Sequence, residues 1–224
     1  GFWKSNPLLY ANKKANPYTH PPKAPFMWTQ GNQVGGRSLT WGGITLRLAH
    51  EDFEASRDKE YNIKWPISYK DLESHYSEIE NFLKIYGNKD DLKQLPNGEY
   101  IGKLPFTESE EIFASNIKEK LNLPFIHSRG FGANKDKTKW PKYSSLGSTL
   151  KEAARLGKIE ILSGHIAEKL VLNKDRKSAK SVILVNQKNG QRSELESKLI
   201  ILCSSTIQTI RILLSSEESN NSNG

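Results

Sequence analysis

The sequence predicts an α/β fold with a helical central part and strands after residue 157. Two observations carry this prediction. Apolar residues recur at helical spacing between residues 68 and 121, and short alternating or continuous apolar segments follow residue 157. With 224 residues, of which 36% are hydrophobic and 26% charged, the chain can form one large domain or two small ones with a sizeable core.

An irregular arm is expected at the start of the chain. Pro21, Pro22 and Pro25 remove N–H donors and bias their neighbours towards extended conformations, so residues 1–30 should contain little regular structure. Aromatic residues such as Trp28 indicate that this arm packs against the rest of the protein. Residues 44–48 alternate in polarity like a short strand or an extended segment.

Three helices are expected in the central part, at residues 68–86, 109–121 and 146–156. Ser68 fits the N-cap of the first helix, and Asp71 stands where a capping box has its acidic residue. Gly87 is expected to end this helix. Gly157 is expected to cap the third helix at its C-terminus.

Short strands are expected in the last part, at residues 158–163, 166–173, 180–187 and 193–198. Residues 188–191 (Lys-Asn-Gly-Gln) predict a hairpin turn. Residues 199–203 form a continuous apolar run, which suits a strand that is covered on both faces, as in a parallel sheet. The small residues 204–206 then open a helix at 207–214. Many FAD-binding domains end in this order of elements. The small residues before the helix let its N-terminus approach an anionic group.

Charge and cysteine content exclude several classes of function. The net charge is +8, but 33 Lys and Arg are scattered among 25 Asp and Glu without a long basic run, which argues against nucleic-acid binding. The single cysteine, Cys203, allows neither an internal disulfide nor a cysteine metal site, and it fits a reducing compartment such as the cytoplasm. No segment approaches the roughly 20 apolar residues of a membrane span. Metal-ligand spacing is absent among the five histidines, His20, His50, His75, His127 and His165.

The densest glycine cluster is the main candidate for a ligand site. It comprises Val34, Gly35, Gly36, Arg37, Ser38, Thr40, Trp41, Gly42 and Gly43, with Leu39 between them. Paired glycines permit positive φ angles and expose backbone N–H groups, which can bind a phosphate or the edge of a flavin. The glycines alone are equally compatible with a turn that binds nothing. The neighbouring arginine, hydroxyl group and tryptophan favour a ligand.

With these neighbours, the cluster resembles the second flavin-contact motif of the glucose–methanol–choline (GMC) oxidoreductase family, and most closely that of its bacterial sugar-dehydrogenase-like branch. The resemblance rests on residues 34–42 (Val-Gly-Gly-Arg-Ser-Leu-Thr-Trp-Gly), 65–72 (Trp-Pro-Ile-Ser-Tyr-Lys-Asp-Leu) with Tyr76, 143–146 (Tyr-Ser-Ser-Leu), 202–206 (Leu-Cys-Ser-Ser-Thr) and 211–214 (Arg-Ile-Leu-Leu). It extends over about residues 20–216. It implies part of an FAD/NAD(P)-binding Rossmann-like domain with a β-meander, together with part of a substrate or cap domain.

The resemblance also implies roles for individual residues. Gly35, Gly36 and Ser38 would lie along the FAD diphosphate and ribityl chain. Thr40, Trp41 and Gly42 would approach the isoalloxazine ring. Ile166 or Ala167 would meet the adenine through main-chain atoms, and Ser204 and Ser205 would lie under the nucleotide. The implied domain division is residues 1–50 for the arm and flavin motif, 51–128 for the substrate or cap side, 129–216 for the return to the FAD domain, and 217–224 for a disordered tail.

This sequence departs from the family pattern at several points. Thr40 stands near the position where some relatives bind the flavin covalently through histidine, so covalent attachment is not expected. Ser205 replaces a usual glycine, and residues 129–141 lack the cysteines found in many relatives. The family's G-x-G-x-x-G strand and its catalytic histidine segment have no counterpart in this chain. The chain is therefore expected to be an internal piece, and no catalytic base is assigned.

The implied activity is oxidation of a CH–OH group in a sugar, polyol or other alcohol, with hydride transfer to FAD. The partners would be this small molecule, an electron acceptor of unspecified kind and, if the enzyme is divided, a partner subunit. One alternative is a catalytically inactive fragment or split subunit with partial flavin-binding capacity. A further alternative is a basic module that binds anionic polymers.

Overall fold

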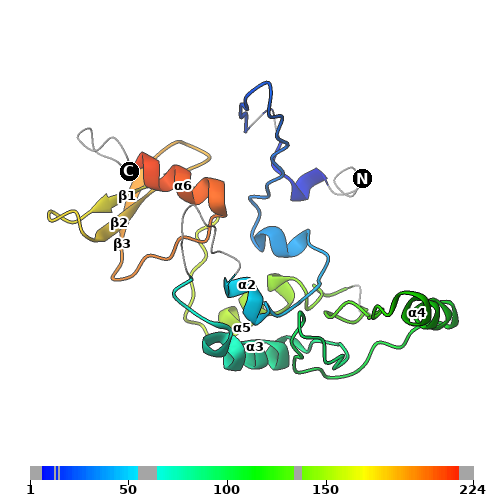
Figure 1. Cartoon of the computed structure of the whole chain (residues 1–224). Helices are drawn as coiled ribbons and strands as arrows, with labels where there is room; N and C mark the ends of the chain where they lie inside the picture. The colour runs from blue at the N-terminus through cyan, green and yellow to red at the C-terminus, as the bar shows by residue number, and fades with distance from the viewer. Residues whose placement is uncertain (1–6, 13, 15, 55–64, 134–137, 217–224) are drawn as a thin grey trace. The chain divides into compact units, whose positions relative to one another are not determined.

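The structure is a computed structural model that describes residues 7–12, 14, 16–54, 65–133 and 138–216. The chain forms two compact units, Gly1–Ile159 and Glu160–Gly224 (Figure 1). The first unit contains the helices of the central part, and the second contains a small antiparallel sheet with one helix. The expected mixture of helices and strands is thus confirmed at the level of mixed secondary structure. The expected disordered tail at 217–224 lies outside the described residues.

The first of the long helices is α3, Tyr69–Leu83. Its capping box is as expected, since the Asp71 carboxylate accepts hydrogen bonds from the Ser68 backbone N–H and hydroxyl, each at 2.7 Å. The helix ends earlier than expected, because Lys84 adopts the left-handed conformation (φ 61°, ψ 61°) and turns the chain. Gly87 has a different role, since a Cβ atom there would lie 2.9 Å from the Tyr100 ring.

Helix α4 spans Glu108–Leu121 and begins one residue before the expected start. Thr107 is its N-cap. The Glu110 carboxylate accepts the Thr107 backbone N–H at 2.7 Å, and the Thr107 hydroxyl accepts the Glu110 N–H at 3.4 Å. Asn122 ends the helix in the left-handed conformation, with φ 51°. Both capping boxes therefore place the helix starts through local hydrogen bonds.

The third expected helix is divided. A 3₁₀ turn, η3 (Ser145–Gly147), is followed by the short α5 (Thr149–Arg155). The Ser144 hydroxyl accepts the Gly147 N–H at 3.1 Å and so closes the 3₁₀ turn, while Ser148 leaves helical geometry with φ −135° and ψ −95°. Gly157 follows the helix with φ 65°, as a glycine after a helix end often does.

The arm and the glycine cluster contain only short helical pieces in the described residues. These are η1 (Pro7–Leu9), η2 (Gly36–Leu39) and α2 (His50–Glu54). Residues 44–48, expected as a short strand or an extended segment, do not form a strand. Ile44 alone makes a bridge there, with Gly130, which also bridges Tyr86.

The second unit is a three-stranded antiparallel meander in the order β1 (His165–Leu172), β2 (Ala179–Asn186) and β3 (Arg192–Glu196), as expected. Helix α6 (Thr206–Ser215) packs on β1 and buries Ile212 (Figure 1). The Ser216 hydroxyl accepts the Leu170 N–H at 2.7 Å and fixes the end of the helix to the strand.

Two expected strands are wrong. Residues 158–163 and 199–203 are not part of any ladder among the described residues, and Leu199 and Ile201 are each 73% exposed. A continuous apolar run becomes a strand only where a neighbouring strand pairs with its N–H and C=O groups. Neither segment pairs with a strand among the described residues, so the strand expected at 199–203 is not formed there.

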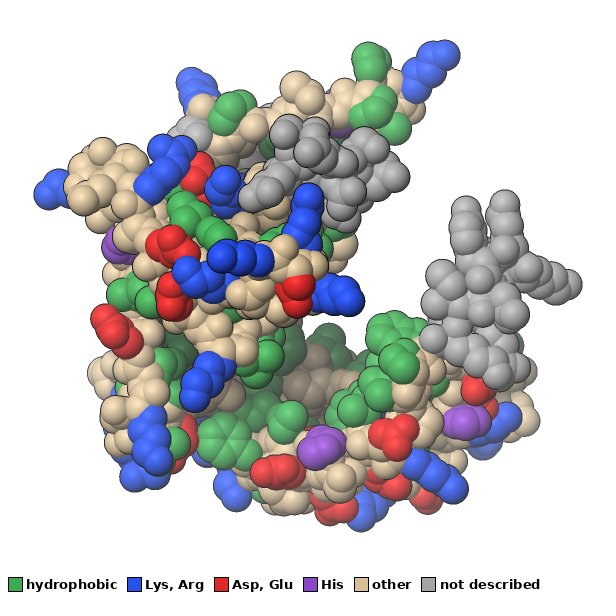
Figure 2. Space-filling model, turned by 90° about the vertical axis from the view of Figure 1, so that its left-hand side faces the viewer, with side chains coloured by type: hydrophobic (Ala, Val, Ile, Leu, Met, Phe, Trp, Pro, Cys, Tyr) green, Lys and Arg blue, Asp and Glu red, His purple; other side chains and the backbone are tan. Residues whose placement is uncertain are grey.

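The buried apolar core of the described residues is small. Its members are Ala49, Phe53, Ile85 and Ile212. Many large apolar side chains are instead exposed, as the green surface in Figure 2 shows. Buried polar residues, above all Arg47, Glu80 and Arg129, therefore contribute much of the specific packing of the first unit.

Candidate functional site

The glycine cluster forms a tight turn with two consecutive left-handed residues. Gly35 has φ 95° and Gly36 has φ 52°, and the Gly36 N–H donates to the Gln33 carbonyl at 2.9 Å. The Gln33 side-chain amide donates in turn to the Gly36 carbonyl at 3.2 Å. Two adjacent positive φ angles are readily available only to glycine, so the backbone requires this pair. A Cβ atom on Gly35 would meet Leu39 and Leu146 at 3.1 and 3.2 Å, whereas one on Gly36 would enter open space.

The hydroxyl of Ser38 is engaged within the protein. It donates to the Gly35 carbonyl at 2.5 Å and accepts the Ser145 N–H at 3.0 Å, and the two hydroxyl oxygens of Ser38 and Ser145 are 3.0 Å apart. These bonds join the glycine turn to η3, which is distant in sequence. The predicted contact of Ser38 with FAD would therefore fall to its backbone more readily than to its hydroxyl.

Trp41 is fixed at one edge and exposed at the other. Its indole N–H donates to the Tyr143 carbonyl at 2.8 Å, and its ring packs edge-on against Phe131 with centroids 5.9 Å apart. The side chain remains 41% exposed. An indole that is oriented by a hydrogen bond and still presents ring surface is suited to contact a planar ligand.

The two glycines that follow Trp41 differ in whether the structure explains the need for glycine. Gly43 is buried, has φ 70°, and a Cβ atom there would lie 3.5 Å from Phe131 and Tyr143. Gly42 is exposed, its φ is not in the positive range, and no atom lies within 4 Å of the place a Cβ would take. The chain's own packing does not explain the glycine at 42. A ligand that approaches the backbone closely would explain it, and the open space at Gly36 and Gly42 fits such a ligand.

The remaining residues of the cluster lie around this turn. Val34 and Arg37 are exposed, and Thr40 is half-buried. The Thr40 N–H and hydroxyl both donate to the Arg37 carbonyl, at 3.0 and 3.3 Å. The structure thus brings residues 34–43 together as one exposed turn within the first unit.

Two buried arginines lie next to this turn, and they were missed in the sequence analysis. Arg47 pairs with Glu80, and its guanidinium also donates to Tyr69 and Ser77. The hydrogen bond to Glu80 raises the pKa of Arg47 above its ordinary value, although burial acts in the opposite direction. Arg129 pairs with Asp90 at 3.0 Å and donates to the Pro96 carbonyl at 2.5 Å. An arginine within an apolar alternation, as at residues 44–48, is a sequence signal that could have indicated Arg47.

The predicted nucleotide residues of the second unit lie on β1 and before α6. Ile166 pairs with Val185 across the sheet. The Ala167 carbonyl accepts a hydrogen bond from Arg211 of α6 at 2.8 Å, so this main-chain acceptor is engaged within the unit. Ser204 and Ser205 are exposed, and Ser205 has φ 68° and ψ 163°. These residues belong to the second unit, whereas residues 34–43 belong to the first.

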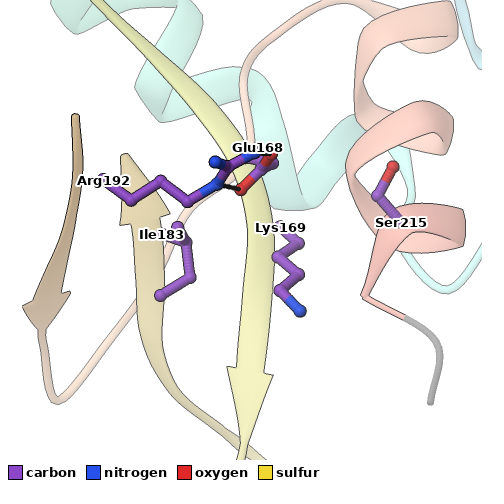
Figure 3. Close-up of a pocket in the computed structure, with 5 residues that line it drawn as sticks. All are labelled: Glu168, Lys169, Ile183, Arg192 and Ser215. Carbon is purple, nitrogen blue, oxygen red and sulfur yellow. Dashed lines mark hydrogen bonds and ion pairs between the residues drawn. The ribbon is translucent and has the colours of Figure 1, made fainter. Parts of the chain in front are cut away.

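A depression lies on the sheet beside the end of α6 (Figure 3). It is lined by Glu168, Lys169, Ile183, Arg192 and Ser215. Arg192 and Glu168 form a two-point ion pair there, with N–O distances of 2.7 and 2.8 Å. This pair lowers the pKa of Glu168.

The described residues contain neither a metal-binding cluster nor a membrane-spanning helix. No group of three or more His, Cys, Asp and Glu side chains lies close enough together to hold an ion. None of the described helices combines the length and the apolar character needed to cross a membrane. Of the five histidines, His20, His50 and His75 are exposed.

Comparisons with known proteins point to one family. Residues 14–223 match a family model described as GMC oxidoreductase. The chain is also 22% identical over 223 residues to a 2-methyl-1,2-propanediol dehydrogenase from Mycolicibacterium austroafricanum. This alignment covers 86% of the chain but only 38% of the relative, so the chain spans well under half of that protein's length.

Proposed function

Because the chain belongs to the GMC oxidoreductase family, we propose that residues 34–43 bind FAD in an enzyme that oxidises a CH–OH group. The observation that carries this proposal is the open space at Gly36 and Gly42 beside the oriented ring of Trp41. Members of this family generally bind FAD, and the dehydrogenase named above is called after an alcohol. The proposed substrate of this enzyme is an alcohol, sugar or polyol.

When bound, the flavin would supply the redox chemistry by accepting a hydride equivalent from the substrate carbon. The residues of this chain would bind and orient it. Gly35 and Gly36 would present backbone N–H groups, and Gly42 would leave room for the ring system. Trp41, held by Tyr143, would cover one part of the ligand. No proton transfer is assigned to a residue of this chain.

The residues predicted for the nucleotide in the second unit are proposed to contact FAD as well. Ile166 or Ala167 would meet the adenine through main-chain atoms; Ile166 is paired with Val185 in the sheet, and the Ala167 carbonyl accepts a bond from Arg211. Ser204 and Ser205 would lie under the nucleotide, just before the N-terminus of α6.

The experiment is a flavin assay of the full-length gene product. Wild-type protein is expected to purify with flavin absorbance near 450 nm. Gly42→Leu should remove this absorbance while the protein stays folded, because the new side chain enters space that no described protein atom occupies. Gly190→Asn in the β2–β3 hairpin is the control, since Asn tolerates the positive φ found there. Full flavin content in Gly42→Leu would contradict the proposed site.

A further inference from the structure

Arg47 is almost completely buried, with 6% of its surface exposed, although it lies only five residues after Gly42. Its Nε and Nη2 atoms donate to the two carboxylate oxygens of Glu80 at 2.9 and 2.6 Å. Nη2 also donates to the Ser77 hydroxyl and Nη1 to the Tyr69 hydroxyl, at 3.0 and 3.1 Å. The guanidinium carbon lies 5.6 Å from the centre of the Tyr76 ring. All these partners belong to α3.

Glu80 is fixed from a second side. Its Oε2 atom accepts the Glu99 N–H at 2.7 Å, and a Cβ atom on Gly98 would lie only 2.6 Å from its Oε1 atom. The carboxylate is thus enclosed between α3 and the loop at residues 98–99. A carboxylate held by three N–H donors from two separate segments, Arg47 and Glu99, has little freedom to move.

The ion pair decides which way the segment after the glycine turn faces. Side chains alternate along an extended chain, so the burial of Arg47 turns the other set outward. Ile44, Leu46 and Leu48 are accordingly 53%, 53% and 47% exposed. Apolar burial alone would favour the opposite orientation, and the buried charges therefore set the position of the segment against the hydrophobic preference.

The same segment is also held through its backbone, at Ile44 and Thr45. The Thr45 N–H donates to the Arg129 carbonyl at 2.8 Å, and Ile44 bridges Gly130. These bonds hold the start of the segment beside residues 129 and 130. The Arg47–Glu80 pair holds the other end of the segment against α3.

The following inference rests on the proposed function. We propose that Arg47 is a positioning residue. Through its ion pair with Glu80 of α3, it holds Trp41 and Gly42 at the place where the flavin is bound. Buried ion pairs add little net stability, because desolvation offsets their attraction, and they are better suited to fix one arrangement. Neither residue needs to touch the flavin. Loss of the pair should therefore act on the flavin's affinity and its environment.

The test uses the full-length protein in wild-type form and as Glu80→Gln, which keeps the shape of the side chain and removes its charge. FAD affinity is measured by reconstitution of the apoprotein, together with the visible circular dichroism and the midpoint potential of the bound flavin. We expect Glu80→Gln to weaken FAD binding on the order of tenfold and to change the flavin's visible spectrum. Arg47→Met should also weaken FAD binding, and Arg47→Lys, which keeps the positive charge, should weaken it less.

Glu110→Gln is the control. It weakens the capping box of α4, in which the Glu110 carboxylate accepts the Thr107 N–H at 2.7 Å. We expect Glu110→Gln to lower thermal stability and to leave the flavin spectrum and potential at wild-type values. If Glu80→Gln does not fold, Tyr69→Phe removes one bond to Arg47 and should weaken FAD binding about threefold.

The outcomes separate the two proposals. One possible result is that the wild type binds flavin and that the folded Glu80→Gln or Tyr69→Phe variant keeps the wild-type FAD affinity, spectrum and potential. This result would overturn the positioning role alone. Equal flavin changes in Glu80→Gln and Glu110→Gln would overturn it as well, because they would reflect general destabilisation. A wild-type protein without flavin would overturn the proposed function and the positioning role together.

Discussion

The carbonyl oxygen of Gly43 lies against Gly130, in the place that a Cβ atom on residue 130 would occupy. Gly130 can come this close because it has no side chain, and it also exchanges two backbone hydrogen bonds with Tyr86, at 2.7 and 3.0 Å. One glycine thus joins the glycine cluster to the segment after α3. The contact is between backbone atoms, so no side-chain movement can relieve a clash there.

Gly130→Ala should therefore destabilise the protein by roughly 1–3 kcal/mol, because the backbone must shift to admit the methyl group. Urea denaturation of the full-length protein measures this change. Gly42→Ala is the control, since its methyl group meets no atom within 4 Å and its effect should stay within about 0.5 kcal/mol. Equal stability of the two variants would contradict the close contact.

Ser205 carries backbone strain at the start of α6. Its φ of 68° and ψ of 163° lie in a region that essentially only glycine adopts, and strain of this kind costs about 1–3 kcal/mol. The Ser205 side chain makes no capping hydrogen bond, so its removal takes away no cap. Ser205→Gly should accordingly stabilise the protein by about 1 kcal/mol, after the entropy of glycine is subtracted.

Thermal or urea unfolding checks this gain, with Ser204→Gly as the control. Ser204 does not have a positive φ, so glycine there only adds freedom to the unfolded chain and should cost about 0.5–1 kcal/mol. The strain at 205 would be disproved by a Ser205→Gly protein that is no more stable than Ser204→Gly.

The local parts of the fold could be predicted from the sequence. The starts of α3 and α4 depend on capping residues within four positions, Ser68 with Asp71 and Thr107 with Glu110. The meander depends on alternation and on a glycine turn at Gly190. Such signals are contained in neighbouring residues, and the structure follows them to within one or two residues at these helix starts.

The non-local parts could not be predicted. Residues 199–203 have the composition of a buried strand, but a strand also needs a partner, which local pattern does not specify. The burial of Arg47 depends on Glu80, 33 residues away. Of the predicted site, the glycine turn could be located from its sequence, but the internal hydrogen bonds of Ser38 depend on Ser145, which is 107 residues distant.

The capping box of α4 should make this helix sensitive to acid. The Thr107 backbone N–H, and then its hydroxyl, hold the pKa of Glu110 below its ordinary 4.5. A carboxylate whose pKa is lower in the folded state stabilises that state fully above its unfolded pKa, and the effect is lost as pH falls through the lowered value. Protection of α4 should therefore decline below about pH 4.5.

Hydrogen exchange of the amides in α4, compared between wild type and Glu110→Gln, measures this effect. The wild type should be better protected near pH 6, and the difference should shrink as pH falls towards about 3. Glu119→Gln, near the other end of the helix, is the control. A difference between wild type and Glu110→Gln that does not depend on pH would count against the role of the ionised carboxylate.

The last prediction concerns Ser38, whose hydroxyl bonds Gly35 and Ser145 within the protein. Ser38→Ala would leave the Ser145 N–H without its acceptor, and an unpaired partly buried group costs about 1–3 kcal/mol. The variant should thus unfold at lower urea concentration, and its flavin affinity should fall only as far as the turn is loosened. A saturating concentration of FAD should then restore the wild-type flavin spectrum.

If the hydroxyl instead bound the flavin diphosphate directly, Ser38→Ala would weaken FAD binding while the apoprotein kept its stability, and Ser145→Ala would leave FAD binding unchanged. Denaturation of the apoprotein and FAD titration of both variants distinguish these two roles.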